Sequence, residues 1–129
     1  MTDMANYLKN KLLNLTLSGT AYSGVNDPYV SLWISDPTDA ETGTEVSGGS
    51  YARTQGSFAL ATTGDTANDA DITFPTATGS WGTVAYIGLH ESATGTGNMI
   101  YHTALDVSKN IDSGDIFKIS SGDLTVELD

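Results

Sequence analysis

The sequence predicts an all-β fold, an antiparallel β-sandwich of jelly-roll type with about seven or eight strands and one N-terminal amphipathic helix. Short runs rich in aromatic and β-branched residues are separated by polar turns at intervals of about 8–12 residues. Apolar residues follow a period of two across residues 29–129, whereas a helical period occurs only in residues 1–18. With 129 residues, the chain fits a single domain spanning residues 1–129.

The helical period extends from Asp3 to about Leu17. Thr2 or Asp3 is the expected N-cap, and Ser18-Gly19 is the expected stop. An isolated helix of this length is marginally stable, so its apolar face must dock on this protein's own sheet or reach a neighbouring subunit. The apolar face consists of Met4, Leu8, Leu12 and Leu15.

Side chains of two kinds alternate along residues 29–35, which predicts a half-buried strand with Val30, Leu32 and Ile34 on its inner face. Residues 81–91 are apolar on both faces and therefore predict a central strand covered on both sides. Gly56 is a candidate bulge. Further strands are predicted at residues 51–60, 71–74, 99–105, 107–111, 115–119 and 124–128, with polar loops at 36–50 and 62–69 and a hairpin turn at 92–98.

Net charge is −11, from 16 acidic and 5 basic residues, and this surface repels the phosphates of nucleic acids. It favours a basic or neutral partner surface. No stretch approaches the ~20 apolar residues that span a bilayer, and Lys9 and Lys11 interrupt the N-terminal leucines, so we expect neither membrane insertion nor a secretion signal. We expect a protein that is soluble and cytoplasmic at synthesis. The absence of cysteine excludes disulfides and thiolate sites.

No residue pattern predicts catalysis, a cofactor or a metal site. His90 and His102 are the only histidines, and we expect both to be partly exposed on paired strands; a shared metal site or a pH-sensitive assembly switch are the alternatives. The acidic loop residues lack the regular ligand spacing of a calcium loop and predict solvated turns. These acidic residues are Asp36, Asp39, Glu41, Asp65, Asp69 and Asp71.

Large aromatic residues on strands favour a core or a subunit interface, although they can also form a sugar-stacking surface. The residues in question are Trp33, Tyr51, Trp81 and Tyr86.

Several blocks of sequence resemble a family of small virion proteins of tailed phages and prophages. The blocks are Ala5-Asn-Tyr-Leu-Lys-Asn-Lys-Leu-Leu13, Ser35-Asp-Pro-Thr-Asp39, Gly43-Thr-Glu-Val-Ser-Gly-Gly-Ser-Tyr-Ala-Arg53, Thr73-Phe-Pro-Thr-Ala-Thr-Gly-Ser-Trp-Gly-Thr83, Ser113-Gly-Asp115 and Ser121-Gly-Asp-Leu-Thr-Val126. Members are labelled tail-fibre or structural proteins, and some similar proteins are capsid cement (decoration) proteins. The resemblance implies a structural role without catalytic residues.

Without a fibrous repeat or heptad, the chain favours a cement protein on the outer surface of the capsid, bridging major capsid protein subunits as a homotrimer. The alternative is a tail-fibre or baseplate-associated protein that binds host glycans. Arg53 is expected to pair with an acid across a subunit boundary or within the domain. The candidate contact residues are Met4, Leu8, Leu12, Leu15, Asp36, Asp39, Tyr51 and Arg53.

Overall fold

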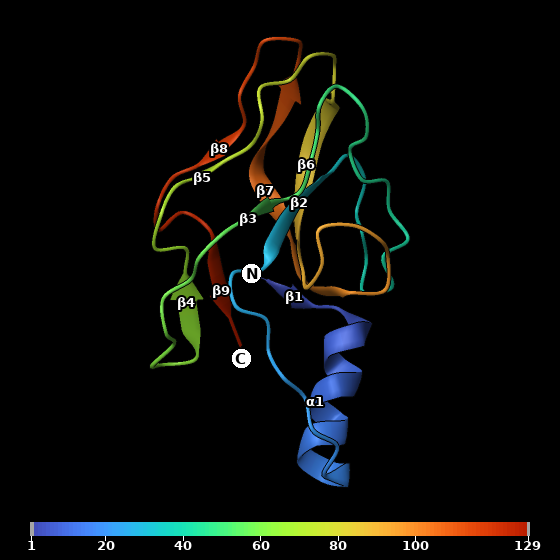
Figure 1. Cartoon of the computed structure of the whole chain (residues 1–129), viewed down its shortest axis with the longest axis vertical. Helices are drawn as coiled ribbons and strands as arrows, with labels where there is room; N and C mark the ends of the chain where they lie inside the picture. The colour runs from blue at the N-terminus through green and yellow to red at the C-terminus, as the bar shows by residue number, and fades with distance from the viewer. Residues whose placement is uncertain (1, 129) are drawn as a thin grey trace.

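A computed structural model describes residues 2–128 as a central antiparallel sheet, a second layer of short strands, and one helix that projects from the body (Figure 1). The central sheet has five strands in the order β1-β7-β6-β2-β3. Their bounds are β1 Asp3–Met4, β2 Tyr29–Trp33, β3 Thr54–Gln55, β6 Gly82–His90 and β7 Met99–Ile111. The predicted all-β fold with an N-terminal helix is confirmed.

The second layer consists of two separate two-stranded ladders rather than one continuous sheet. In one ladder β4 (Asp65–Ala67) pairs with β9 (Thr125–Glu127), and in the other β5 (Ile72–Thr73) pairs with β8 (Lys118–Ile119). Both ladders pack against one face of the central sheet and close the main hydrophobic core. That core includes Val30, Leu32, Ile87 and Leu89 from the sheet and Ile72, Phe74, Phe117, Ile119, Leu124 and Val126 from the second layer.

The hairpin predicted at residues 92–98 joins β6 to β7, as expected. The predicted strands at 99–105 and 107–111 are one strand, β7, interrupted by a wide bulge. Val84 lies opposite Lys109, but Tyr86 lies opposite Ala104, so residues 105–108 have only one residue of β6 across from them. Extra residues in one strand bend it and increase its twist.

The paired strands β2 and β6 are buried on both faces where they meet. Two-sided cover was predicted for residues 81–91 and is confirmed for the second half of β6, but the prediction of a half-buried strand at residues 29–35 is wrong. The face expected to meet solvent carries Ser31, Trp33 and His90, all of them buried. Residues 36–45 cover this second face, because Glu45 bridges to Trp33 and the backbone N–H of Gly97 donates to Glu41.

Two expectations about the strands after β2 are wrong. Of the strand predicted at residues 51–60, only β3 forms, and the side chains of Tyr51 and Arg53 before it turn inward to the partly buried carboxylate of Glu45. Gly56 is buried with its α-carbon against Ile72, where a β-carbon would lie 2.6 Å from Cδ1 of that residue. The loop predicted at residues 62–69 contains β4, whose three residues are too few to show a period.

Helix α1 spans Asn6–Ser18, three residues later than predicted at its start. Asp3–Met4 forms β1 and pairs with β7, so Thr2 and Asp3 are not caps; Ala5 occupies the N-cap without a capping side chain. The predicted stop is confirmed, because Gly19 adopts a left-handed conformation with φ of 65° and its N–H donates to Asn14.

Gly88 brings β2 and β6 close together on their second face. A β-carbon there would lie 2.7 Å from Ser31 Oγ, 3.0 Å from Trp33 Nε1 and 3.1 Å from His90 Nε2. We expect Gly88→Ala to lower the free energy of unfolding by about 1–3 kcal/mol, because overpacking displaces buried polar groups. Gly24→Ala is the control, since a β-carbon at that position would have no atom within 4 Å. Urea unfolding measures both, and equal stability of the two variants would contradict the prediction.

Candidate interaction surface

The first turns of α1 are fixed to the body by backbone hydrogen bonds and by burial. The N–H of Ala5 donates to Ile100 of β7 and the N–H of Asn6 donates to Asp39, both over 2.9 Å. Leu8 is part of the main core. The helix therefore starts at a defined position and direction on the sheet.

Asp39 strengthens this attachment through its side chain. Its carboxylate accepts a hydrogen bond from Lys9 of α1 and lies 2.7 Å from Nε2 of His102 on β7. Lys9 and His102 hold the pKa of Asp39 below its usual value. Asp39, proposed from the sequence as a partner contact, thus links the helix, a loop and the sheet within this chain.

Two tyrosines hold the helix and the returning chain to the end of β6. The hydroxyl of Tyr7 donates to Glu91 over 2.8 Å, and the hydroxyl of Tyr22 donates to the other oxygen of the same carboxylate. Burial, together with the hydrogen bond to Glu91, raises the pKa of Tyr22. The segment after the helix is therefore held near the helix base.

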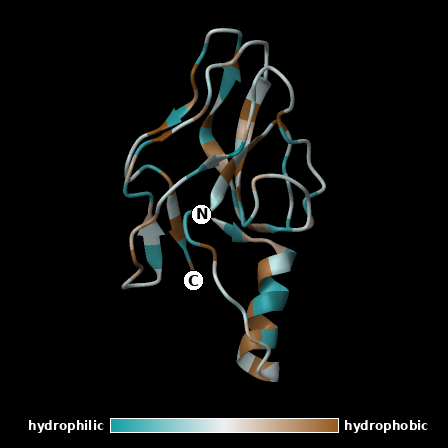
Figure 2. Ribbon diagram, viewed as in Figure 1, coloured by the Kyte–Doolittle hydropathy of each residue, from teal (hydrophilic) through white to brown (hydrophobic). Residues whose placement is uncertain are grey.

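The distal half of α1 has no comparable attachment. Figure 2 shows hydrophobic residues on the part of the helix that extends away from the sheet. Leu12 is half-buried, whereas Leu13, Leu15 and Leu17 are 55%, 40% and 78% exposed. Contiguous exposed apolar side chains on a soluble protein typically mark an interaction site.

Leu13 and Leu17 form a second apolar stripe that the sequence pattern did not predict. They are four residues apart and so share one helix face, about a third to half a turn around from the face that Leu8 and Leu12 bury. The two leucines were visible in the sequence, but a search for a single amphipathic face leaves them out. Of the four predicted helix contacts, Met4 lies in β1, Leu8 is core, Leu12 is half-buried and Leu15 is partly exposed.

Charge is distributed unevenly between α1 and the rest of the chain. The helix contains Lys9 and Lys11 and no acidic residue, so all 16 acidic residues lie outside it. Residues 12–26 contain no charged side chain at all. The exposed leucines of α1 therefore lie in a part of this acidic chain that carries no acidic side chain.

The other predicted contact residues have different environments. Asp36 is exposed, and its carboxylate accepts a hydrogen bond from the N–H of Thr38 in the same turn. Tyr51 is a core residue, with its ring stacked on Phe74 and edge-on to Trp81. Its hydroxyl donates to Glu45 over 2.6 Å.

Arg53 makes its ion pair inside this chain, one of the two alternatives left open by the sequence. Its side chain is only 4% exposed, and its guanidinium binds Glu45 through Nε (2.9 Å) and an Nη atom (2.8 Å). It also donates to the carbonyls of Ser92 and Gly95. Burial acts to raise the pKa of Glu45, but the hydrogen bonds from Arg53 and Tyr51 outweigh it and the pKa is lowered.

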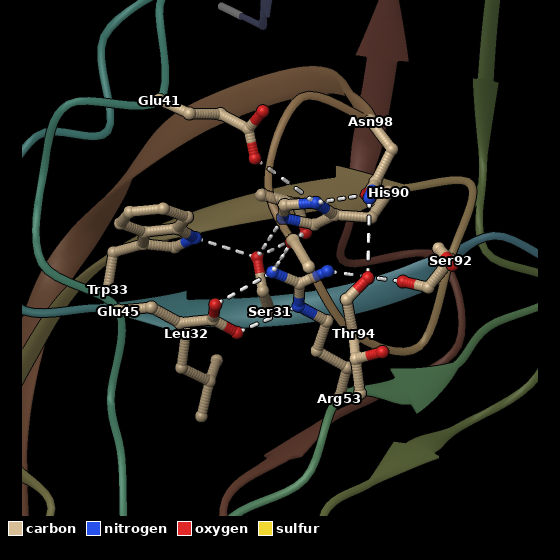
Figure 3. Close-up of polar contacts among 12 residues, drawn as sticks. Ser31, Leu32, Trp33, Glu41, Glu45, Arg53, His90, Ser92, Thr94 and Asn98 are labelled. Carbon is tan, nitrogen blue, oxygen red and sulfur yellow. Dashed lines mark hydrogen bonds and ion pairs between the residues drawn. The ribbon is translucent and has the colours of Figure 1, made fainter.

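A buried polar network surrounds His90 on the second face of the sheet (Figure 3). Trp33 Nε1 donates to Ser31 Oγ over 2.7 Å, and Ser31 Oγ lies 2.8 Å from His90 Nε2. His90 Nδ1 lies 3.0 Å from Asn98 Oδ1, so this network places the proton of a neutral imidazole on Nδ1. Glu41 Oε1 lies 3.6 Å from the same nitrogen and is buried without a hydrogen-bond partner.

This network resembles a hydrolase triad in atom types but not in access. Ser31 and His90 are both 0% exposed, so no substrate carbonyl can reach the hydroxyl. His102 is also buried and binds Asp39, so the expectation of partly exposed histidines is wrong, and the two rings have separate partners. Among residues 2–128, no three histidine, aspartate or glutamate side chains are placed to hold a metal ion.

The remaining surface features offer no convergent chemistry. Asp65, Asp69 and Asp71 bind Thr63, Ser57 and Ser121 respectively, each in its own turn or crossing. A groove of about 530 Å³ beside the β7 bulge has apolar residues, two aspartates and two lysines in its lining. Trp33 and Trp81 are buried, which leaves no tryptophan on the surface for sugar stacking. In the described part of the chain, no helix has the length and apolarity to cross a membrane.

Removal of Arg53 is expected to destabilise the protein strongly. Arg53→Met leaves the carboxylate of Glu45 partly buried without its cation, and we expect a loss of about 3 kcal/mol in the free energy of unfolding. The double variant Arg53→Met/Glu45→Gln removes the unpaired charge and should recover part of that loss. Urea unfolding at pH 7 measures both, and a single variant as stable as wild type would refute the structural role.

The lowered pKa of His90 predicts how the free energy of unfolding depends on pH. Burial and the charge of Arg53 lower the pKa of His90 from 6.5 to about 4. Because the unfolded chain takes up the proton first, stability is complete above pH 6.5 and falls as the pH decreases toward 4, by about 3 kcal/mol from this residue. His90→Gln removes the titration, so its unfolding free energy should change less over that window. Parallel curves for the two proteins would contradict this assignment.

Comparison with known proteins identifies the family to which the chain belongs. No curated protein matches the chain. One family model matches residues 3–127, which include the helix and all nine strands of the described structure. The chain therefore belongs to the Gp80 family, described as podophage GP4 fiber I protein gp80, a family of fibre-type structural proteins of phage virions.

Proposed function

We propose that this chain is a structural subunit of a phage tail fibre, without catalytic activity, and that it joins the fibre through α1. The observation that carries the proposal is the family match over residues 3–127, which extends across both the projecting helix and the β-body. The fibre description of the family therefore covers the projecting helix and the β-body together.

The physical support comes from the contrast between the two halves of the helix. Its base is held by the core, by Asp39 and by Glu91, so its direction is set by the folded body. Its distal half presents Leu13, Leu15 and Leu17, which are 55%, 40% and 78% exposed within residues 2–128. A rigidly mounted helix with an uncovered apolar stripe matches the way helices dock on partner surfaces.

The second candidate function is that of a cement protein on the capsid surface, where the same helix would contact the major capsid protein. Cement subunits would bridge major capsid proteins and stabilise the assembled shell, because they bind that state preferentially. The fibre reading has the support of the family's own description, which the cement reading lacks. Glycan binding is left out of the proposal because both tryptophans lie in the interior.

Copy number in purified virions separates the two readings. We expect a few to a few tens of copies per particle, measured by quantitative mass spectrometry against the major capsid protein, with gold-labelled antibody on the tail. A ratio close to that of the major capsid protein, with label over the shell, would support cement and overturn the fibre assignment. Complete absence from particles would overturn both.

A further inference from the structure

We propose that the partner of the exposed stripe on α1 is α1 of a second copy, so that two chains pair through antiparallel helices. The inference deepens the proposed function, because it names the partner of the helix, and it rests on α1 being an assembly surface. Three observations support a second copy: the spacing of the stripe, the location of charge, and the polarity of the helix ends.

The stripe can complement itself. Asn10, Leu13 and Leu17 follow i, i+3, i+7 spacing and lie along one helix face. In an antiparallel pair centred between the leucines, Leu13 of each copy meets Leu17 of the other. This is the reciprocal contact that a two-fold axis requires.

Charge confines self-association to this helix. Each copy carries a net charge of −11, with every acidic residue outside α1, so two bodies repel each other when they approach closely. An antiparallel pair joins the copies at the uncharged residues 12–26 and sends the acidic bodies to opposite ends. A parallel bundle of three helices, the arrangement that suits a trimer, would place the bodies side by side.

The helix ends also complement one another in the antiparallel arrangement. The last turn of α1 contains no basic residue to offset the negative end of the helix dipole, and both helix lysines lie in its first half. In the register that pairs Leu13 with Leu17, Asn10 and Lys9 lie opposite residues 20 and 21 of the other copy, just beyond the negative end of its helix. Lys9 also binds Asp39 of its own chain, so it holds a fixed position there.

The expected interface is small, because few side chains on each copy take part. It falls below the roughly 800 Å² per partner of a standard stable complex, so the pair should be weak in solution and reinforced in the virion. Added salt should strengthen it by screening the repulsion between the bodies. An interface held mainly by ion pairs would respond in the opposite way.

Sedimentation equilibrium of the whole chain tests the proposal. Between about 10 µM and about 1 mM, at a salt concentration of roughly 0.5 M, we expect the average mass to rise toward twice that of one chain. Leu17→Glu should weaken association at least tenfold. Leu60→Glu is the matched control, because Leu60 is 94% exposed on a distant loop and the variant adds the same charge. Circular dichroism checks that both variants keep the wild-type fold.

The relative direction of the two helices can be tested by disulfide cross-linking of introduced cysteines, because the chain contains no cysteine of its own. An oxidised mixture of the Leu13→Cys and Leu17→Cys variants should form mainly the mixed disulfide, whereas parallel helices would link identical positions.

The possible outcomes separate this inference from the proposed function. A monomer at every concentration and salt would overturn the pairing, and so would equal weakening by Leu17→Glu and Leu60→Glu or a mass of three copies. If the chain is monomeric yet Leu17→Glu alone is lost from virions, the helix binds a different virion protein. In that case the fibre assignment stands and the self-pairing fails.

Discussion

The position of the helix depends on residues 36–45, which pack across the second face of the central sheet. Through Asp39 this loop holds both α1 and His102, and through Glu41 it holds the hairpin after β6. The face that it covers contains Ser31 and His90, polar groups that need hydrogen-bond partners once they are removed from water. The loop that buries this network therefore also fixes where the helix begins and the direction in which it runs.

Charge and shape are arranged in a consistent way in this molecule. The acidic residues lie on the β-body and its loops, and the only strongly buried cation, Arg53 among residues 2–128, is satisfied by Glu45 and by loop carbonyls. The helix carries no acid and ends in exposed leucines. Two such bodies repel each other, whereas the helix carries no acidic residue, so the proposed pairing would be confined to the helix. Under that proposal, the separation of charge and exposed leucines in space would let two chains associate without bringing their acidic bodies together.

The parts of the fold that the sequence predicted are those with enough residues to show a period or a turn. Residues 29–33, the long β6 strand, the hairpin at 92–98 and the stop at Gly19 all belong to this group. Three of the two-residue strands, β3, β5 and β8, lie within longer predicted strands, at residues 51–60, 71–74 and 115–119. The short strands β1 and β4 were missed because they show no alternation, and pairing with β7 changed the expected helix start into β1. Contacts between distant segments, such as Arg53 with Glu45 or Tyr7 and Tyr22 with Glu91, have no local signal in the chain.

Under the proposed pairing, the two leucine stripes of α1 would let assembly stabilise the helix itself. A helix of 13 residues has little stability in isolation, and this one lacks a capping side chain at its start and a basic residue in its last turn. Its first half gains stability from Leu8 and the contacts of Asp39, whereas beyond Leu12 the fixed points are the cap at Gly19 and the returning segment with Tyr22. Burial of Leu13 and Leu17 against another helix would therefore order the distal turns as well as join two chains. Binding and helix formation would then reinforce each other, and a small interface would hold more firmly once the surrounding particle keeps the partners close.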